Sequence, residues 1–161
     1  MNSKIVLADY HDAAQAQDLV HLLDHYAHSS LGGGKPLAAG VKLRLVSELA
    51  KILNAFSVLA YVDSRAVGLV NCFQSFSTFK CKPLVNIHDV VVHEDFRGLG
   101  LATKMFHKVE AIANERGCCK LTLEVLTHNT IAKKAYTKFG FSPFELTAEY
   151  GQALFFEKLL Y

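Results

Sequence analysis

One stretch of this chain passes from a strand pattern to a helix pattern through a glycine turn, and it restricts the possible folds most. Residues 85–92 are β-branched and almost continuously apolar, as in a strand covered on both faces. An amphipathic helical pattern then continues to about residue 116. The glycine turn (residues 97–102) joins the two. The free N–H groups of a first helical turn converge there, and the helix dipole adds about half a positive charge. The sequence therefore predicts an anion site.

The glycine turn suits a phosphorylated ligand. Gly98 and Gly100 have no Cβ atom, so a phosphate can approach the backbone closely, and Arg97 adds a cation beside them. Residues 97–161 hold nine Lys and Arg against six Asp and Glu, whereas residues 1–96 hold eight against nine. The excess of cations thus lies in the half that begins with the turn. The overall charge of +2 excludes a strongly basic nucleic-acid-binding protein.

Length and composition indicate one domain over residues 1–161. Apolar residues make up 51% of the chain and charged residues 20%, as in globular proteins. The apolar runs are too short to span a membrane, and the first residues do not resemble a signal peptide. We therefore expect a cytoplasmic protein with no membrane partner. The four cysteines lack the spacing of a zinc site, and we expect them to be structural thiols.

The periodicity of the chain predicts an α+β domain with a mixed central sheet and the element order βααβββαβαββ. Strands are expected at residues 4–8, 56–62, 66–74, 85–92 and 120–126, followed by a terminal hairpin of residues 141–147 and 152–160. Helices are expected after a cap at Asp12, over residues 41–54, from the glycine turn onward and over residues 129–139. Phe76, Phe79 and Pro83 are expected in an irregular connection.

Other patterns that suggest ligands do not meet the chemical requirements. The glycine-rich segment 28–36 lacks the first glycine of a P-loop and has proline in place of the required hydroxyl residue. The glycine turn is not a dinucleotide fingerprint, because Thr103 stands where the third glycine is needed. His21, His25 and His28 share a helical face that we expect to be exposed to solvent, and we predict no metal site.

Two motifs in the second half of the chain resemble those of the Gcn5-related N-acetyltransferase (GNAT) family. The glycine turn matches the family's acetyl-CoA-binding pattern R/Q-x-x-G-x-G/A as Arg97-x-x-Gly100-x-Ala102. One helix and one strand later, the family's second motif has a similar counterpart, Asn129-x-x-Ala132-x-x-x-Tyr136-x-x-x-Gly140-Phe141. The resemblance covers residues 85–142 and implies the GNAT fold, with acetyl-CoA as the co-substrate.

The resemblance also implies a cofactor site made largely of backbone groups. The end of the strand would pair with the pantetheine arm, and one of its N–H groups would polarise the thioester carbonyl. The glycine turn would bind the pyrophosphate, and the following helix would flank the pantetheine. The residues expected in these roles are Val90, Val91, Val92, Arg97, Gly98, Leu99, Gly100, Leu101, Ala102, Thr103, Asn129 and Ala132.

The implied reaction is direct attack of an amine on the acetyl thioester. Tyr136 matches the family's tyrosine position, and an ordinary tyrosine pKa of about 10 keeps the phenol protonated at neutral pH. It is therefore the expected general acid. His88 and Asp89 interrupt the apolar strand and are the candidates for the general base, with Glu124 as a third. Strand alternation predicts that His88 and Asp89 face opposite sides of the sheet, so that only one faces the substrate.

The acceptor is expected to be a small primary amine, since residues 73–79 and the polar pair at 88–89 resemble the diamine-acetyltransferase branch. A protein N-terminus or lysine is the alternative acceptor. A non-catalytic, CoA-binding regulatory module is the alternative of another class. Tyr136 and the polar pair argue against it, because a protein that only binds CoA needs neither. Edge strands and the terminal hairpin suggest a homodimer.

Overall fold

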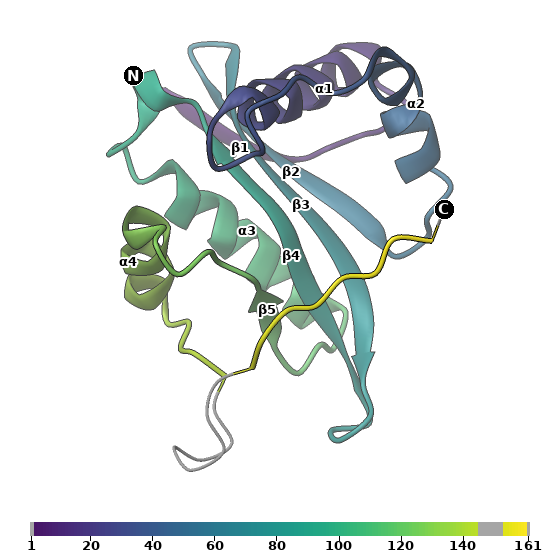
Figure 1. Cartoon of the computed structure of the whole chain (residues 1–161), viewed down its shortest axis with the longest axis vertical. Coiled ribbons are helices and arrows are strands. Elements are labelled where there is room, and N and C mark those ends of the chain that lie inside the picture. The colour runs from purple at the N-terminus through teal and green to yellow at the C-terminus, as the bar shows by residue number, and fades with distance from the viewer. Residues whose placement is uncertain (1, 145–152, 161) are drawn as a thin grey trace.

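A computed structural model describes residues 2–144 and 153–160 and confirms the predicted mixed α+β fold class (Figure 1). Five strands form one sheet in the order β1-β2-β3-β4-β5, in which β5 alone pairs in parallel with its neighbour. The elements are β1 (Ser3–Leu7), α1 (Ala13–His28), α2 (Ala39–Leu49), β2 (Ala55–Val62), β3 (Arg65–Ser77), β4 (Lys82–Val92), the 3₁₀ turn η1 (Glu94–Phe96), α3 (Leu101–Glu115), β5 (Leu121–Leu123) and α4 (Thr130–Phe139).

The helices cover both faces of the sheet. Helices α1 and α2 lie on one face, and α3 and α4 lie on the other (Figure 1). On the α1 face, Leu19 and Leu22 pack with Leu59, Leu69 and Val91. The α3 face is larger, and its buried members include Phe56, Val70, Ile87, Met105 and Phe106. Because strand side chains alternate, these two clusters show which way each residue of β2, β3 and β4 points.

The first two helices begin and end for local reasons. As predicted, Asp12 caps α1, because its carboxylate accepts hydrogen bonds from the N–H groups of Ala14 and Gln15. Helix α2 ends at Leu49, five residues earlier than predicted. Leu53 is 99% exposed, so no core contact holds another helical turn there, and the chain turns to enter β2.

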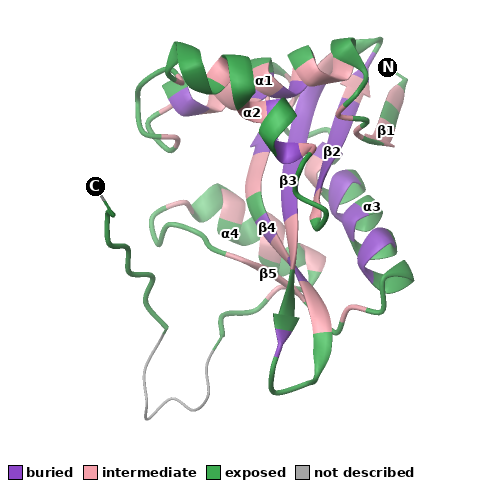
Figure 2. Cartoon of the chain, turned by 90° about the vertical axis from the view of Figure 1, so that its right-hand side faces the viewer, coloured by how far each residue is buried: buried purple, intermediate pink, exposed green. Residues whose placement is uncertain are grey.

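The hairpin of β3 and β4 is longer than predicted, and the prediction of an irregular connection was wrong for Phe76 and Pro83. These two residues face each other in the ladder, which continues to the pair Ser77 and Lys82. Pro83 is tolerated because its carbonyl accepts a hydrogen bond from Cys119, on the side away from β3. The missing N–H of proline therefore costs no hydrogen bond to β3. The exposed hairpin tip extends beyond the body of the sheet (Figure 2).

The end of the chain differs most from prediction. Strand β5 has three residues in place of the seven predicted, and its pairing with β4 ends at Ile87. Residues 141–144 and 153–160 of the predicted terminal hairpin form no strand, and the rest of it lies outside the described residues. The segment 153–160 is exposed and runs clear of the sheet, so it has no strand to pair with (Figure 2). None of the helices described is long and apolar enough to cross a membrane.

Gly32, which follows α1, provides a test of how closely the chain packs against the end of that helix. A Cβ atom there would lie 2.1 Å from the carbonyl oxygen of Tyr26, a backbone atom that cannot move independently of α1. We expect Gly32→Ala to lower the free energy of unfolding by about 2 kcal/mol, the range of overpacking. Gly40→Ala is the matched control, because its Cβ meets nothing within 4 Å and alanine favours a helix. Urea denaturation should show opposite shifts of the two midpoints, and equal midpoints would contradict this packing.

Candidate functional site

The edge of β4 that faces β5 is unpaired beyond Ile87 in the part of the chain that the structure describes. The N–H of His93 donates to the carbonyl of Val67 on β3. Since successive backbone groups of a strand point to opposite edges, those of Val90 and Val92 face away from β3. The carbonyl of Val92 indeed accepts from Arg97 rather than from β3. Val90 thus presents free backbone groups along an unpaired strand edge, whereas Val92 presents a free N–H and a carbonyl that Arg97 already bonds.

The glycine turn continues from this edge and holds a row of free donors. Gly98 and Gly100 have φ angles of 81° and 72°, which is the left-handed region that favours glycine. Gly100 caps α3 without a side-chain hydrogen bond. Among the described residues, the N–H groups of residues 98–103 find no acceptor. Such a row at a helix N-terminus has the geometry of an anion site, and the binding of an anion here stays a prediction.

The side chains around the turn leave its backbone accessible. Leu101 points into the core and is almost completely buried, so it fixes the start of α3 while its N–H remains free. Arg97 is exposed, and its Nε donates to the Val92 carbonyl at 3.3 Å, which holds the guanidinium beside the strand edge. Thr103 is exposed on the first helical turn, whereas the ammonium group of Lys104 bonds Ser3. The nearest fixed cation for an anion in the turn is therefore Arg97.

Three other residues predicted for the cofactor site have structural partners. The side chain of Val91 is buried in the α1-face cluster, and alternation turns its backbone toward β3. Asn129 caps α4, where its side-chain oxygen accepts from the N–H of Ala132 at 3.1 Å. This bond fixes the first turn of α4 but occupies the Ala132 N–H. Val91 therefore has no free group toward the unpaired edge, and Ala132 can contribute only its methyl group.

A β-bulge at His88 overturns the prediction that His88 and Asp89 face opposite sides of the sheet. Asn71 pairs with Asp89 and Cys72 pairs with Ile87, so His88 is an extra residue in β4. The ring of His88 packs edge-on against Phe73, 5.5 Å between centroids, and Asp89 accepts from Asn71. Phe73 belongs to the α1-face cluster, and Asn71 lies two residues before it on the same face. Both polar side chains therefore lie on the α1 face.

Asp89 is the end of a buried polar chain that the sequence analysis missed. Its Oδ2 accepts from the Asn71 side chain at 2.9 Å, and the Asn71 oxygen accepts from Ser57 at 2.6 Å. The Ser57 hydroxyl also contacts the hydroxyl of Tyr10 at 2.8 Å. Ser57 is completely buried and Asn71 is 3% exposed. Their polar type within apolar strands was a signal, but the sequence could not show that they touch.

Tyr136 lies on the opposite face, on α4. Its ring packs edge-on against Phe106 and Phe141, with centroids 5.7 and 6.0 Å away. Burial raises the pKa of Tyr136 to about 12, and the nearby Tyr26 adds to that rise. Its hydroxyl has no hydrogen-bond partner among the described residues. A protonated phenol with a free hydroxyl is available to donate a proton.

Tyr26, on α1, connects the two faces and was not predicted as a site residue. Burial raises the pKa of Tyr26, and the charge of Asp89 raises it further. The charge of Tyr26 in turn affects Tyr136, so these three groups lie near one another. Glu124, the third candidate for the base, is exposed after the end of β5 and bonds no described residue. The polar groups of the site therefore meet where β4 and β5 separate.

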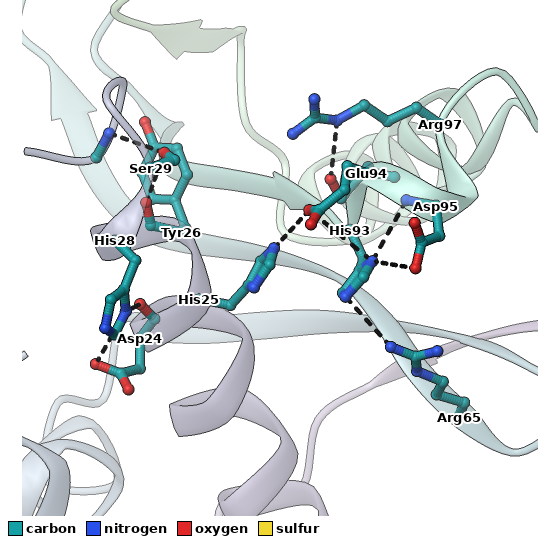
Figure 3. A network of polar contacts seen from close by, with 12 residues as sticks. Asp24, His25, Tyr26, His28, Ser29, Arg65, His93, Glu94, Asp95 and Arg97 are labelled. Carbon is teal, nitrogen blue, oxygen red and sulfur yellow. Dashed lines mark hydrogen bonds and ion pairs between the residues drawn. The ribbon is translucent and has the colours of Figure 1, made fainter. Parts of the chain in front are cut away.

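Histidines near the glycine turn form a second polar cluster (Figure 3). His25 was predicted to face solvent, but its ring stacks on His93 at 4.5 Å and its Nε2 lies 2.7 Å from Glu94. The ligand atoms of these three residues lie within 4.8 Å of one another, the spacing of a possible metal site. However, the rings are parallel within 9°, and Arg65 lies 3.2 Å from the His93 Nε2. Their in-plane lone pairs cannot both aim at one ion between them, so the cluster serves to tie α1 to η1.

Comparisons with known proteins agree with this geometry. Residues 36–141 match the family described as "Acetyltransferase (GNAT) family". A "Thialysine N-epsilon-acetyltransferase" of Bos taurus is 34% identical over 74 residues, which cover 46% of this chain and 43% of that protein. The chain spans between 35% and 54% of the length of the curated relatives it matches.

Two solved structures share the fold over nearly the whole chain. One is AAC(6')-Iy in complex with the bisubstrate analog CoA-S-monomethyl-acetylneamine, with a TM-score of 0.78 and 19% identity; 99% of this chain and 100% of that chain are covered. The other is a transcriptional regulator from Bacillus halodurans C-125, with a TM-score of 0.78 and 21% identity; 96% and 100% are covered. At such identities the likeness shows the fold alone.

The environment of Tyr136 predicts an unusual titration. Because burial raises its pKa to about 12, the phenol should stay protonated through pH 10 and ionise about two pH units above an ordinary tyrosine. ¹³C NMR of protein labelled at the tyrosine Cζ should show this, with the resonance assigned by its absence from Tyr136→Phe. Tyr26→Phe is the control variant, and it should lower the midpoint slightly by removing a neighbouring charge. A midpoint near 10 would contradict the burial of this phenol.

Proposed function

Because the chain belongs to the acetyltransferase (GNAT) family, we propose that it transfers the acetyl group of acetyl-CoA to a primary amine of a small molecule. The observation that carries the proposal is the presence of two neighbouring sets of free backbone groups. One is formed by the outward groups of Val90 and the N–H of Val92 on the unpaired strand edge, and the other by the N–H groups of residues 98–103 in the glycine turn. A diphosphate needs several convergent donors, and an extended amide arm needs a strand edge to pair with. The strand edge and the turn follow each other in this chain, in the order in which the pantetheine arm and the diphosphate occur in CoA.

The residues present fit this co-substrate. The free N–H groups of residues 98–103 would hold the pyrophosphate, and the Arg97 guanidinium would neutralise part of its charge. The backbone of Val90 and Val92 would hold the pantetheine arm as an added strand, and one of these N–H groups would polarise the thioester carbonyl. Acetyl-CoA supplies an activated acyl carbon when bound. Asn129 would keep α4 in place beside the arm through its cap.

Asp89 and Tyr136 divide the proton transfers in this proposal. Asp89 accepts the proton that the substrate ammonium must lose, directly or through a water molecule. The amine nitrogen then forms the new C–N bond as the C–S bond breaks, and Tyr136 donates its proton to the departing thiolate. The nitrogen releases its second proton as the amide forms, and this proton restores the Tyr136 phenol through solvent. We assign the base to Asp89 rather than His88, because Asp89 is held by Asn71 beside Tyr26. His88, packed on Phe73, would line the acceptor side.

A small amine is favoured as the acceptor by the chemistry of a matched relative, whose name gives thialysine as its substrate. A protein N-terminus or lysine is the alternative acceptor. The non-catalytic regulator remains the alternative of another class, since one structure of this fold is named a transcriptional regulator. The presence of Asp89 and Tyr136 argues against a non-catalytic regulator, because the binding of CoA requires neither residue. A homodimer and a cytoplasmic location remain predictions from the sequence.

Binding of acetyl-CoA is the first test. At a concentration about 100 times the dissociation constant, acetyl-CoA should add about 2.7 kcal/mol to the free energy of unfolding, measured as a thermal shift. Gly100→Ala should weaken binding about tenfold or more, because a Cβ is strained at its φ of 72°. Gly40→Ala is the control.

Thiol release is then measured across polyamines, amino acids, aminoglycosides and peptides. No shift would contradict the proposal, and a shift without turnover would favour the regulator.

Substitutions separate the acid from the base. Tyr136→Phe should lower kcat about a hundredfold, the effect of losing a general acid, with little change in the affinity for acetyl-CoA. Asp89→Asn should lower kcat by a similar factor, whereas His88→Gln should act mainly on KM for the amine. Steady-state kinetics with the best amine checks all three. If His88→Gln lost more kcat than Asp89→Asn, the assignment of the base would be reversed.

A further inference from the structure

The buried chain of hydroxyl and amide groups behind Asp89 has no part in the chemistry described so far. It crosses the α1 face of the sheet from Tyr10, in the connection between β1 and α1, through Ser57 on β2 and Asn71 on β3. Its three hydrogen bonds are 2.8, 2.6 and 2.9 Å long. Buried polar groups are costly unless they are bonded, so a complete chain inside an apolar cluster needs a physical explanation.

The donors in this chain all point the same way. A carboxylate only accepts, so the Asn71 amide must present its NH₂ group to Asp89 and its oxygen to Ser57. The single hydroxyl proton of Ser57 is then used on that oxygen. Tyr10 must therefore be the donor in its contact with Ser57. Each bond polarises the next, and the last one ends on Asp89.

We propose that Tyr10, Ser57 and Asn71 are positioning residues that fix the direction of the Asn71 amide and thereby the orientation of the Asp89 carboxylate. The inference rests on the proposed function, in which Asp89 accepts the proton of the amine. Without the Ser57 hydroxyl, nothing holds the Asn71 oxygen, so the amide can turn that oxygen toward Asp89 when the carboxyl group is protonated and able to donate. Ser57 acts on Asp89 through Asn71 only, since it makes no described contact with Asp89.

Other titratable groups lie near Asp89, namely Tyr26 and His88 on the α1 face and Cys72 on the α3 face, and must be separated from this effect. Tyr26 approaches from α1, and the charge of Asp89 raises the pKa of its phenol. Cys72 on β3 is buried, which raises the pKa of its thiol, and the charge of Asp89 adds to this. His88 is the adjacent residue in β4 and carries an ionisable ring on the same face. The pH measurements are therefore made in the His88→Gln background.

The test is a graded series read from the acidic limb of the pH profile of kcat/KM. We expect the midpoint of that limb to rise by a few tenths of a pH unit in Tyr10→Phe, by about half a unit in Ser57→Ala and by about one unit in Asn71→Ala. Ser57→Cys keeps the shape with a weaker donor and should fall between the wild type and Ser57→Ala. The matched control is Tyr61→Phe. Tyr61 lies on the same strand and face as Ser57, and the substitution removes its 2.8 Å hydrogen bond to Asp18 on α1. It should keep the midpoint of the parent protein.

A direct readout distinguishes failure of the positioning role of Tyr10, Ser57 and Asn71 from failure of the proposed function. ¹³C NMR of the Asp89 carboxyl carbon gives its titration midpoint in every variant, with or without a substrate. If the wild-type protein acetylates no amine, the proposed function fails while the NMR series still tests the chain. Ser57→Ala could instead keep the wild-type midpoint for Asp89 and lose only thermal stability, as Tyr61→Phe would. The hydrogen bonds behind Asp89 would then be structural only, and the inference would be overturned. Tyr10 is partly exposed, so Tyr10→Phe keeps the test open if the buried variants do not fold.

Discussion

The single extra residue at His88 in β4 determines the geometry of the whole site. Before it, β4 pairs with β5 on one edge and with β3 on the other. After it, the alternation is reset, so that Asp89 faces α1 and the backbone groups of Val90 and Val92 face the unpaired edge. Without the bulge, a continuous two-residue period would turn Val90 and Val92 toward β3 and Asp89 away from Asn71. One irregularity thus places the strand edge, the candidate base and the start of the glycine turn together.

The glycine turn depends on support from elsewhere, because its own residues are exposed and make few contacts. Because residues 97–100 are exposed, the free N–H groups there are open to solvent, and an unpaired donor costs little when it is open to water. What fixes its position is Leu101 in the core on one side and the contact of His25 with Glu94 on the other. The turn is therefore held between α1 and α3, on both sides of the sheet.

The parts of the site that depend on local sequence could be predicted, and those that depend on pairing could not. The glycine turn, the helix that begins near residue 129 and the position of Tyr136 on it follow from short-range patterns of turns and helices. The bulge at His88 does not, because a run of apolar residues carries no mark of where its register shifts. Tyr10, Ser57 and Asn71 lie in three separate segments, and only the sheet register brings them together. The same reason explains why the prediction of an irregular connection at Phe76 and Pro83 was wrong, because the ladder there continues through Lys82 and Pro83, two residue types that are depleted in strands.

The positioning chain and the burial of Tyr136 act in the same sense on the proposed reaction. Hydrogen bonds that donate to a carboxylate favour its charged form, and burial favours the neutral form of a phenol, whose pKa here rises to about 12. The acid is thus kept protonated over a wide range of pH, although a phenol with a raised pKa donates its proton less readily. A substrate ammonium with a pKa near 10 is then the group whose protonation limits the rate at neutral pH. Burial therefore lowers the acid strength of Tyr136 and fixes its protonation state. In the proposal, the hydrogen bonds behind Asp89 fix the direction of its carboxylate oxygen, which matters most when the amine is small and has few other contacts to orient it.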